Sequence, residues 1–259
     1  MTRSASIMIA VLLLACGCLA KYGPQKKFDL YLTTGYGFGI GGTNVGASET
    51  YAGGILTARD DHYQNFGWGI KLDGGVDYLV MDKLYVQGGL CFNFGVPGIS
   101  NVQDDGAGTK TTVNYGWTTF GIKALVKPTF QLFDLFDVYT GFGLGLYFAG
   151  SGADIKSTTP GGDFSARSVD NNNPALAVIG SLGVEYPLTE NIIFFGELYC
   201  EAMSFTTTST AYSNSTYPGG NNYFNHIVYY HEDETNSPPP PKTPGTNVAI
   251  RAGVRFPIF

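Results

Sequence analysis

Charged residues recur at every second position within several otherwise apolar segments of this 259-residue chain. Side chains two residues apart lie on the same face of a β-strand. Charges that share such a face are expected to meet inside the protein, where hydrogen-bonded ion pairing offsets the cost of burying them. The candidates for this internal charge network are the following acidic and basic residues: Asp29, Lys71, Asp73, Asp77, Lys123, Lys127, Asp137, Glu185, Glu197, Glu201, Arg251 and Arg255.

Two histidines lie near acidic residues and serines in a polar segment. His226 and His231 precede the acidic run 232–234, and Ser204 and Ser209 lie upstream. Histidine and carboxylate groups ligate metals, and a histidine beside a serine can activate it as a nucleophile. The histidine spacing matches no established metal site, however, and no spacing links either serine to a histidine. We therefore predict no metal, no cofactor and no catalytic residue, with a lipid-modifying enzyme as the weakest alternative.

A glycine-rich run, from Gly35 to Gly41 with glycine at every second position, is partly similar to a dinucleotide-binding loop. A dinucleotide loop requires a helix directly after it and does not place glycine at every second residue. Glycines that make room for large inward side chains such as Tyr31 are the simpler explanation. We predict no nucleotide site.

Eight segments alternate apolar residues with glycine, polar or charged residues at the period of a β-strand. They are residues 28–41, 66–78, 84–94, 115–127, 138–148, 176–186, 192–202 and 248–258. The polar face contains too little apolar volume to fill a soluble barrel of the lipocalin type. Only 14% of the residues are charged, against about a quarter in soluble domains. The apolar face is therefore predicted to contact lipid.

Short and long connectors alternate between these segments. The short ones are residues 81–83, 130–136 and 187–191, and the long polar ones are residues 43–64, 97–111, 151–174 and 206–246. Short periplasmic turns and long extracellular loops are typical of outer-membrane barrels. We therefore predict an all-β fold, a transmembrane up-and-down antiparallel β-barrel of eight strands in the bacterial outer membrane.

Two places depart from the regular alternation. Tyr115 and Trp117 are out of phase with the rest of their segment, which predicts either a bulge near Thr118 and Thr119 or a barrel rim above the membrane. At the C-terminus, the aromatic residue Phe259 is out of phase with the outward face, and a kink at Pro257 would restore the phase.

The first twenty residues are predicted to be a secretory signal peptide. Their apolar run, residues 7–14, is too short to span a bilayer as a helix. Cleavage after Ala20 would leave residues 21–259 as the barrel. Alternatively, Cys16 ends a short sequence that resembles a bacterial lipobox, and acylation there would add a lipid anchor.

Charge and cysteine content restrict the partners. The formal net charge is −6, which argues against nucleic acid as a partner. Cys91 and Cys200 fall in predicted strands that are not neighbours, so we predict that they are unpaired.

The last long connector is rich in aromatic residues among Ser, Thr and Asn, a composition suited to ligand contact. The candidate contact residues are Tyr212, Tyr217, Tyr223, Phe224, Tyr229 and Tyr230. The prolines at 238–241 are expected to stiffen the returning chain. Residues 223–230 can equally extend a strand or form a hairpin above the membrane.

The pattern resembles that of the small eight-stranded outer-membrane proteins, the group of the OmpA transmembrane domain, OmpX and OmpW. The resemblance is carried by the Gly-Tyr-Gly-Phe-Gly run at 35–39, by residues 139–147 and by the final segment 248–259. It implies an outer-membrane location, with membrane lipid and the barrel-assembly machinery as partners, the latter through the strand that ends at Phe259. Members of the group serve as structural proteins, adhesins, narrow pores or conduits for small apolar molecules.

Two interpretations of the charged interior follow. Eight-stranded barrels have little free lumen, which favours a polar plug over a gate that opens when ion-pair partners exchange. From the strand order we expect Glu197 and Glu201 to reach Arg251, and Arg255 to reach Asp29. The predicted function is a surface-exposed integral membrane protein whose loops contact host or environmental ligands, or which has a structural role. The alternative is a narrow porin or conduit for small solutes.

Overall fold

The computed structural model describes residues 28–258 except residues 53, 82, 97, 134–135, 190, 217–224 and 230–239. The predicted signal peptide, the lipobox cysteine Cys16 and the terminal Phe259 lie outside the described residues. Over the part of the chain that the structure describes, no helix is long and apolar enough to cross a membrane.

Eight antiparallel strands form a closed ring. In ring order they are β1 (Phe28–Gly39), β4 (Gly69–Met81), β5 (Leu84–Phe94), β7 (Lys110–Phe133), β8 (Phe136–Thr159), β10 (Ala175–Thr189), β11 (Ile192–Ala202) and β15 (Asn247–Pro257). The ring closes where β15 pairs with β1, with Leu32 opposite Val254. Closure leaves none of these strands with an unpaired edge inside the barrel. The predicted fold class, an all-β transmembrane up-and-down barrel of eight strands, is confirmed.

The outward face of the barrel is apolar and the inward face is polar. Large outward side chains such as Leu176, which is 71% exposed, make up the apolar outward surface that we call the belt. Its other members include Leu30, Leu32, Leu72, Leu90, Phe92, Phe120, Phe142, Leu144, Phe148, Leu182, Phe194, Leu198 and Ile250. The charged side chains lie inside. A soluble barrel would have the reverse arrangement, whereas this one suits a barrel surrounded by lipid.

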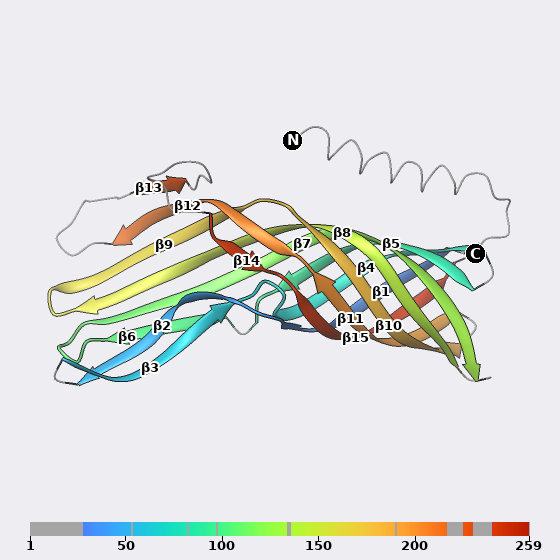
Figure 1. The fold of residues 1–259 in the computed structure, drawn as a ribbon, viewed down its shortest axis with the longest axis horizontal. Coiled ribbons are helices and arrows are strands. Elements are labelled where there is room, and N and C mark those ends of the chain that lie inside the picture. Colours follow the sequence, from blue (N-terminus) through green and yellow to red (C-terminus); the bar gives the residue numbers. More distant parts are fainter. Residues whose placement is uncertain are drawn as a thin grey trace.

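The long polar connectors fold largely as strands rather than as irregular loops. β7 and β8 are 24 residues each and continue past the belt, at the left in Figure 1. Around them lie β2 (Thr43–Ala52), β3 (Ile55–Gln64), β6 (Ile99–Asp104), β9 (Gly162–Asn172), β12 (Ser204–Thr216), β13 (Asn225–Tyr229) and β14 (Lys242–Pro244). We call this second region the extension. Its sheet order is β3-β2-β6-β7-β8-β9-β12-β13, with β14 paired to β12.

The predicted bulge near Thr118 and Thr119 is wrong. β7 pairs with β5 and β8 in unbroken register through both residues. Trp117 is in phase with the inward face and is buried. Its aromatic side chain departs from the polar pattern because β7 leaves the belt at this level, which agrees with the barrel-rim alternative.

A kink at Pro257, which would have restored the phase of the last residues, is not present as far as Ile258. Pro257 stays in register with Asp29, and the backbone N–H of Ile258 donates to the Phe28 carbonyl at 2.8 Å. Ile258 lies on the outward face, so the alternation continues past the proline.

The position predicted for Phe66 is also wrong. The alternation places Phe66 on the outward face of a strand. The strand begins only at Gly69, whose φ of +127° favours glycine, and Phe66 lies in the turn before it with 1% of its surface exposed. Asn65 holds this turn: its side-chain amide donates to the Ile40 and Gly41 carbonyls, each at 2.9 Å. The turn therefore folds over the barrel mouth.

Candidate functional site: the charged lumen

Three levels of ion pairs fill the barrel, and the first lies near the short turns. There Arg255 pairs with Asp29 at 3.5 Å, with Asp77 at 3.6 Å and with Glu185. Lys127 lies 3.3 Å from Asp77 and 3.9 Å from Glu185. The Arg255–Asp29 contact follows from the closing strand pair, in which Asp29 lies opposite Pro257 and Tyr31 opposite Arg255.

Asp137 and Gln87 lie at the same level. Asp137 is half-buried on β8, opposite Glu185 in the register with β10. The Gln87 side-chain amide donates to Asp77 at 2.8 Å. Asp77 therefore accepts from an amide in addition to the two cations.

The middle level is centred on Arg251. Its guanidinium pairs with both Asp73 and Glu197, and Lys123 lies 2.5 Å from Asp73. The guanidinium carbon is also 3.4 Å from the ring centre of Tyr199. Two cations thus share one carboxylate, and one cation bridges two carboxylates.

The third level surrounds Glu201, near the barrel mouth. Lys71 pairs with Glu201 at 2.8 Å, and Asn247 donates to it at 2.9 Å. The hydroxyls of Tyr199 and Tyr147 also donate to Glu201, the former at 2.9 Å. The expected Glu201–Arg251 contact does not form between these two described residues. In the β11–β15 register Glu201 lies opposite Asn247, and its cation comes from β4, which is not a neighbouring strand.

Tyrosine rings cross glycines to reach these carboxylates. Tyr139 on β8 lies opposite Gly183 on β10, which lies opposite Glu197 on β11. A Cβ atom at Gly183 would overlap the Tyr139 ring. Because that atom is absent, the Tyr139 hydroxyl reaches Glu197 at 3.1 Å.

Three further members of the network, Tyr139, Tyr147 and Tyr199, were not among the predicted residues. All three are fully buried and donate to its acidic residues. Tyr199 is in strand phase with Glu197 and Glu201, and this phase was the signal that could have identified it. Each of the eight ring strands contributes at least one hydrogen-bonded or ion-paired side chain to the lumen.

Apolar side chains cover the network at the mouth; we call them the mouth cluster. Phe66 packs edge-on against Phe205, with ring centres 5.2 Å apart. Trp117 and Met203 are buried in the same cluster. The Asn93 side-chain amide donates to the Phe66 carbonyl at 2.5 Å and fixes the turn from below.

The extension contains the described part of the candidate contact surface. Tyr212 on β12 lies opposite Ser168 on β9 and His226 on β13, and Tyr229 lies opposite Ser209. Tyr217, Tyr223, Phe224 and Tyr230 lie outside the described residues, as do His231 and the acidic run 232–234. Among the described residues, no group of three or more His, Cys, Asp or Glu side chains could hold a metal ion.

Side-chain hydrogen bonds link the strands of the extension. Asp170 accepts from Ser151 and from Thr210, each at 2.8 Å. The Tyr115 hydroxyl donates to the Val45 carbonyl at 2.8 Å, and burial raises the pKa of this hydroxyl. These bonds link β2 to β7 and link both β8 and β12 to β9, in addition to the backbone pairing of the sheet.

The two cysteines of the described chain are free and face different environments. Cys91 is buried in the lumen on β5, and Cys200 is exposed on β11. The two strands are not neighbours in the ring.

The protein resembles known proteins in its fold. No protein-family model matches the chain, and no curated protein matches its sequence. A major outer membrane protein from Thermus thermophilus is similar in structure, with a TM-score of 0.52 and 14% identity over 91% of this chain and 100% of that chain. Ail, the attachment invasion locus protein of Yersinia pestis, shows a weaker likeness, with a TM-score of 0.32 and 10% identity over 89% of this chain and 97% of that one. The chain therefore has the fold of a solved outer-membrane β-barrel.

Proposed function

We propose that the protein is an integral protein of the bacterial outer membrane whose barrel is closed and whose extension contacts ligands outside the cell. The belt supports the membrane location, because apolar side chains of this size are stable on a surface only against lipid or a partner. Membrane lipid and, through the C-terminal strand, the barrel-assembly machinery are the partners we infer. Recovery of the protein from the aqueous cell fraction without detergent would contradict the location.

The observation that carries the closed-barrel proposal is the packing of the lumen. The ion-paired side chains of the three levels are at most 6% exposed, and the mouth cluster covers them. A solute would have to separate several buried ion pairs, and breaking one buried pair costs several kcal/mol. The refolded protein is expected to be silent in planar-bilayer recordings.

A narrow pore or conduit for small solutes is the second candidate function. Asp73 is shared by Lys123 and Arg251, so the partners of this carboxylate could exchange without leaving it unpaired. If the network is a gate, the wild-type protein conducts, and Arg251→Ala raises its single-channel conductance. If neither protein conducts, the gate is excluded.

Ligand contact by the extension is tested by replacing residues 212–241 with a short turn. The barrel strands lie outside this segment, so the variant is expected to fold and to keep the gel mobility of the folded barrel. Attachment of bacteria displaying the variant to epithelial cells should be lost. A matched control replaces residues 47–60, in the β2–β3 hairpin, and should keep attachment. Unchanged attachment in the first variant would refute the assignment.

We expect no enzymatic activity. A lipid-modifying reaction dependent on the histidines would be abolished by His226→Ala or His231→Ala, assayed on phospholipid in mixed micelles. Hydrolysis or acyl transfer that is detected with the wild-type protein and lost in either variant would contradict the absence of enzymatic activity.

A further inference from the structure

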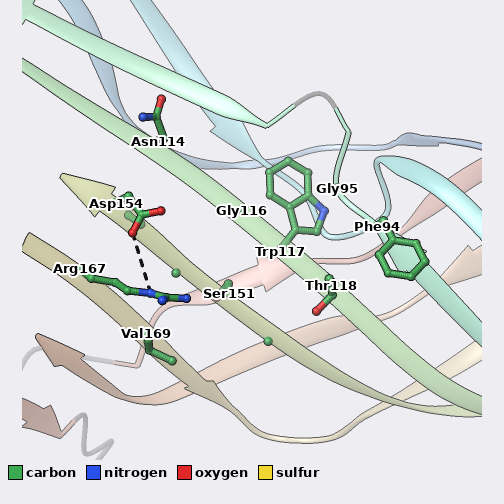
Figure 2. Close-up of a pocket in the computed structure, with 13 residues that line it drawn as sticks. Phe94, Gly95, Asn114, Gly116, Trp117, Thr118, Ser151, Asp154, Arg167 and Val169 are labelled. Atoms are coloured by element: carbon green, nitrogen blue, oxygen red, sulfur yellow. Dashed lines mark ion pairs between the residues drawn. The ribbon is translucent and has the colours of Figure 1, made fainter. Parts of the chain in front are cut away.

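A hollow of about 540 Å³ lies on the outward face, where the belt meets the extension. We call it the rim groove. Figure 2 shows its lining residues, which come from β7, β8, β9, the end of β5 and Gly95 directly after it. β5 ends at Phe94 and β6 begins only at Ile99, so β7 lacks a continuous neighbouring strand along one side here.

Absent side chains create the groove. A Cβ atom at Gly116 on β7 would meet no atom within 4 Å, and one at Gly150 on β8 would meet only the Thr118 hydroxyl, at 3.8 Å. Neither glycine has a positive φ. Because neither backbone nor packing requires glycine at these positions, open space is what the two residues provide.

Polar groups line the side of the groove nearer the extension. Asn114, Asp154 and Arg167 lie opposite one another in a single row across β7, β8 and β9. Asp154 and Arg167 form an ion pair at 3.9 Å, and their side chains are 65% and 70% exposed. The row offers a carboxylate that accepts hydrogen bonds, a guanidinium that donates them and an amide that does both.

Aromatic side chains lie on the belt side. Phe92, Phe120 and Phe148 are neighbours across β5, β7 and β8, with successive ring centres 5.0 Å and 6.4 Å apart. Phe120 is two residues from Thr118, on the same outward face. We call these three rings the aromatic ladder. A molecule that crosses this boundary meets apolar rings first, then an open glycine floor, then polar groups.

We propose that the rim groove binds the sugar head group of a glycolipid whose acyl chains lie on the aromatic ladder. Sugar hydroxyls both donate and accept hydrogen bonds, which the mixed polar row can satisfy. A phosphate head group would meet the negative charge of Asp154 beside the positive charge of Arg167. The proposal rests on the membrane location, and it is independent of a closed lumen and of ligand contact by the extension.

The test compares lipid retention by variants of the full chain. Protein is refolded in nanodiscs of phosphatidylcholine, phosphatidylglycerol and a digalactosyl lipid, transferred to mild detergent, and examined by native mass spectrometry. The wild type should retain digalactosyl lipid. Gly116→Val should reduce retention about fivefold or more, the factor for one lost hydrogen bond, because its side chain would occupy the floor of the groove, where a Cβ atom meets no protein atom within 4 Å.

Gly180→Val is the matched control. Gly180 is an outward glycine of β10, and a Cβ atom there also meets nothing within 4 Å. This variant should retain digalactosyl lipid as the wild type does. Arg167→Ala should lower retention of digalactosyl lipid as Gly116→Val does. If Gly116→Val fails to fold, Arg167→Ala is the variant that tests the groove.

Three results would overturn the proposal. Equal retention by the wild type and by the folded groove variants would show that the groove holds no lipid. Preferential retention of phosphatidylglycerol would show a phosphate site. Displacement of the lipid by an equal concentration of soluble digalactose would show that the aromatic ladder contributes nothing.

Discussion

Arg251 shows how the barrel stabilises charges that would be costly to bury singly. Its side chain is 2% exposed and pairs with Asp73 and Glu197. Without it, Glu197 would keep the hydrogen bond from Tyr139 but would lose its direct ion pair, whereas Asp73 would keep its ion pair with Lys123. The cost of removing Arg251 is therefore set mainly by Glu197, the buried carboxylate that loses its ion-pair partner.

Arg251→Ala is expected to lower the free energy of unfolding by about 3–5 kcal/mol. Urea titration of the refolded protein in lipid vesicles measures this. Arg59→Ala is the control, because Arg59 pairs with Glu49 and Asp61 on the exposed edge of the extension and should show no measurable change. Equal unfolding midpoints for the two variants would contradict the role assigned to the buried pairs.

Glycine and tyrosine act as pairs in the lumen. Gly183→Val would place a side chain where the Tyr139 ring lies, and overpacking of this kind costs about 1–3 kcal/mol. Gly180→Val, three residues earlier on the same strand, points outward into open space and should cost nothing. Thermal unfolding, followed by circular dichroism, compares the two. Similar melting temperatures for the two variants would argue against the position of the Tyr139 ring beside Gly183 in the lumen.

At the scale of elements, β7 and β8 connect the barrel to the extension. Their register is continuous from Lys110 opposite Thr158 to Val126 opposite Phe142. The same two strands therefore cross the belt, pass the rim groove and form the centre of the extension sheet. Backbone hydrogen bonds of a continuous antiparallel pair are protected along its whole length, inside or outside lipid.

Hydrogen–deuterium exchange tests this continuity. Amides of residues 111–117 and 151–157 should exchange slowly, at rates near those of the barrel strands, although they lie beyond the belt. Amides of residues 106–108, in the tip between β6 and β7, should exchange fast and serve as the internal control. Equally fast exchange in all three segments would show that the extension is a set of open loops.

At the scale of the whole molecule, the barrel has its polar groups inside and its apolar groups outside. The two free cysteines report on these two faces, because Cys91 lies in the packed lumen and Cys200 on the outward surface. A thiol is modified only where the reagent can reach it.

An apolar dye maleimide should therefore label Cys200 but not Cys91 in the protein refolded in vesicles from residue 21 onwards. Brominated acyl chains should quench the dye on Cys200. Both cysteines should react after denaturation, and Cys200→Ala should abolish labelling of the folded protein. Labelling of Cys91 in the folded state, or the absence of quenching, would contradict the inside–outside assignment.

The sequence alone determined the direction in which most strand side chains point. Alternation along a strand is local: Lys71 and Leu72 face opposite sides whatever their neighbours are. Closure by eight strands also followed from the number of alternating segments. The same local signal failed where strands leave the belt, as at Trp117, and where a turn replaces a strand, as at Phe66.

Only the tertiary structure decided which charges meet. Glu201 pairs with Lys71 across the lumen, and this partner depends on how the strands are staggered when the sheet closes. The pairing of polar connectors into the extension and the hollow beside Gly116 likewise require distant strands to lie side by side. A period of two encodes the face of each residue, but the partner opposite that face is set by the register of the whole ring.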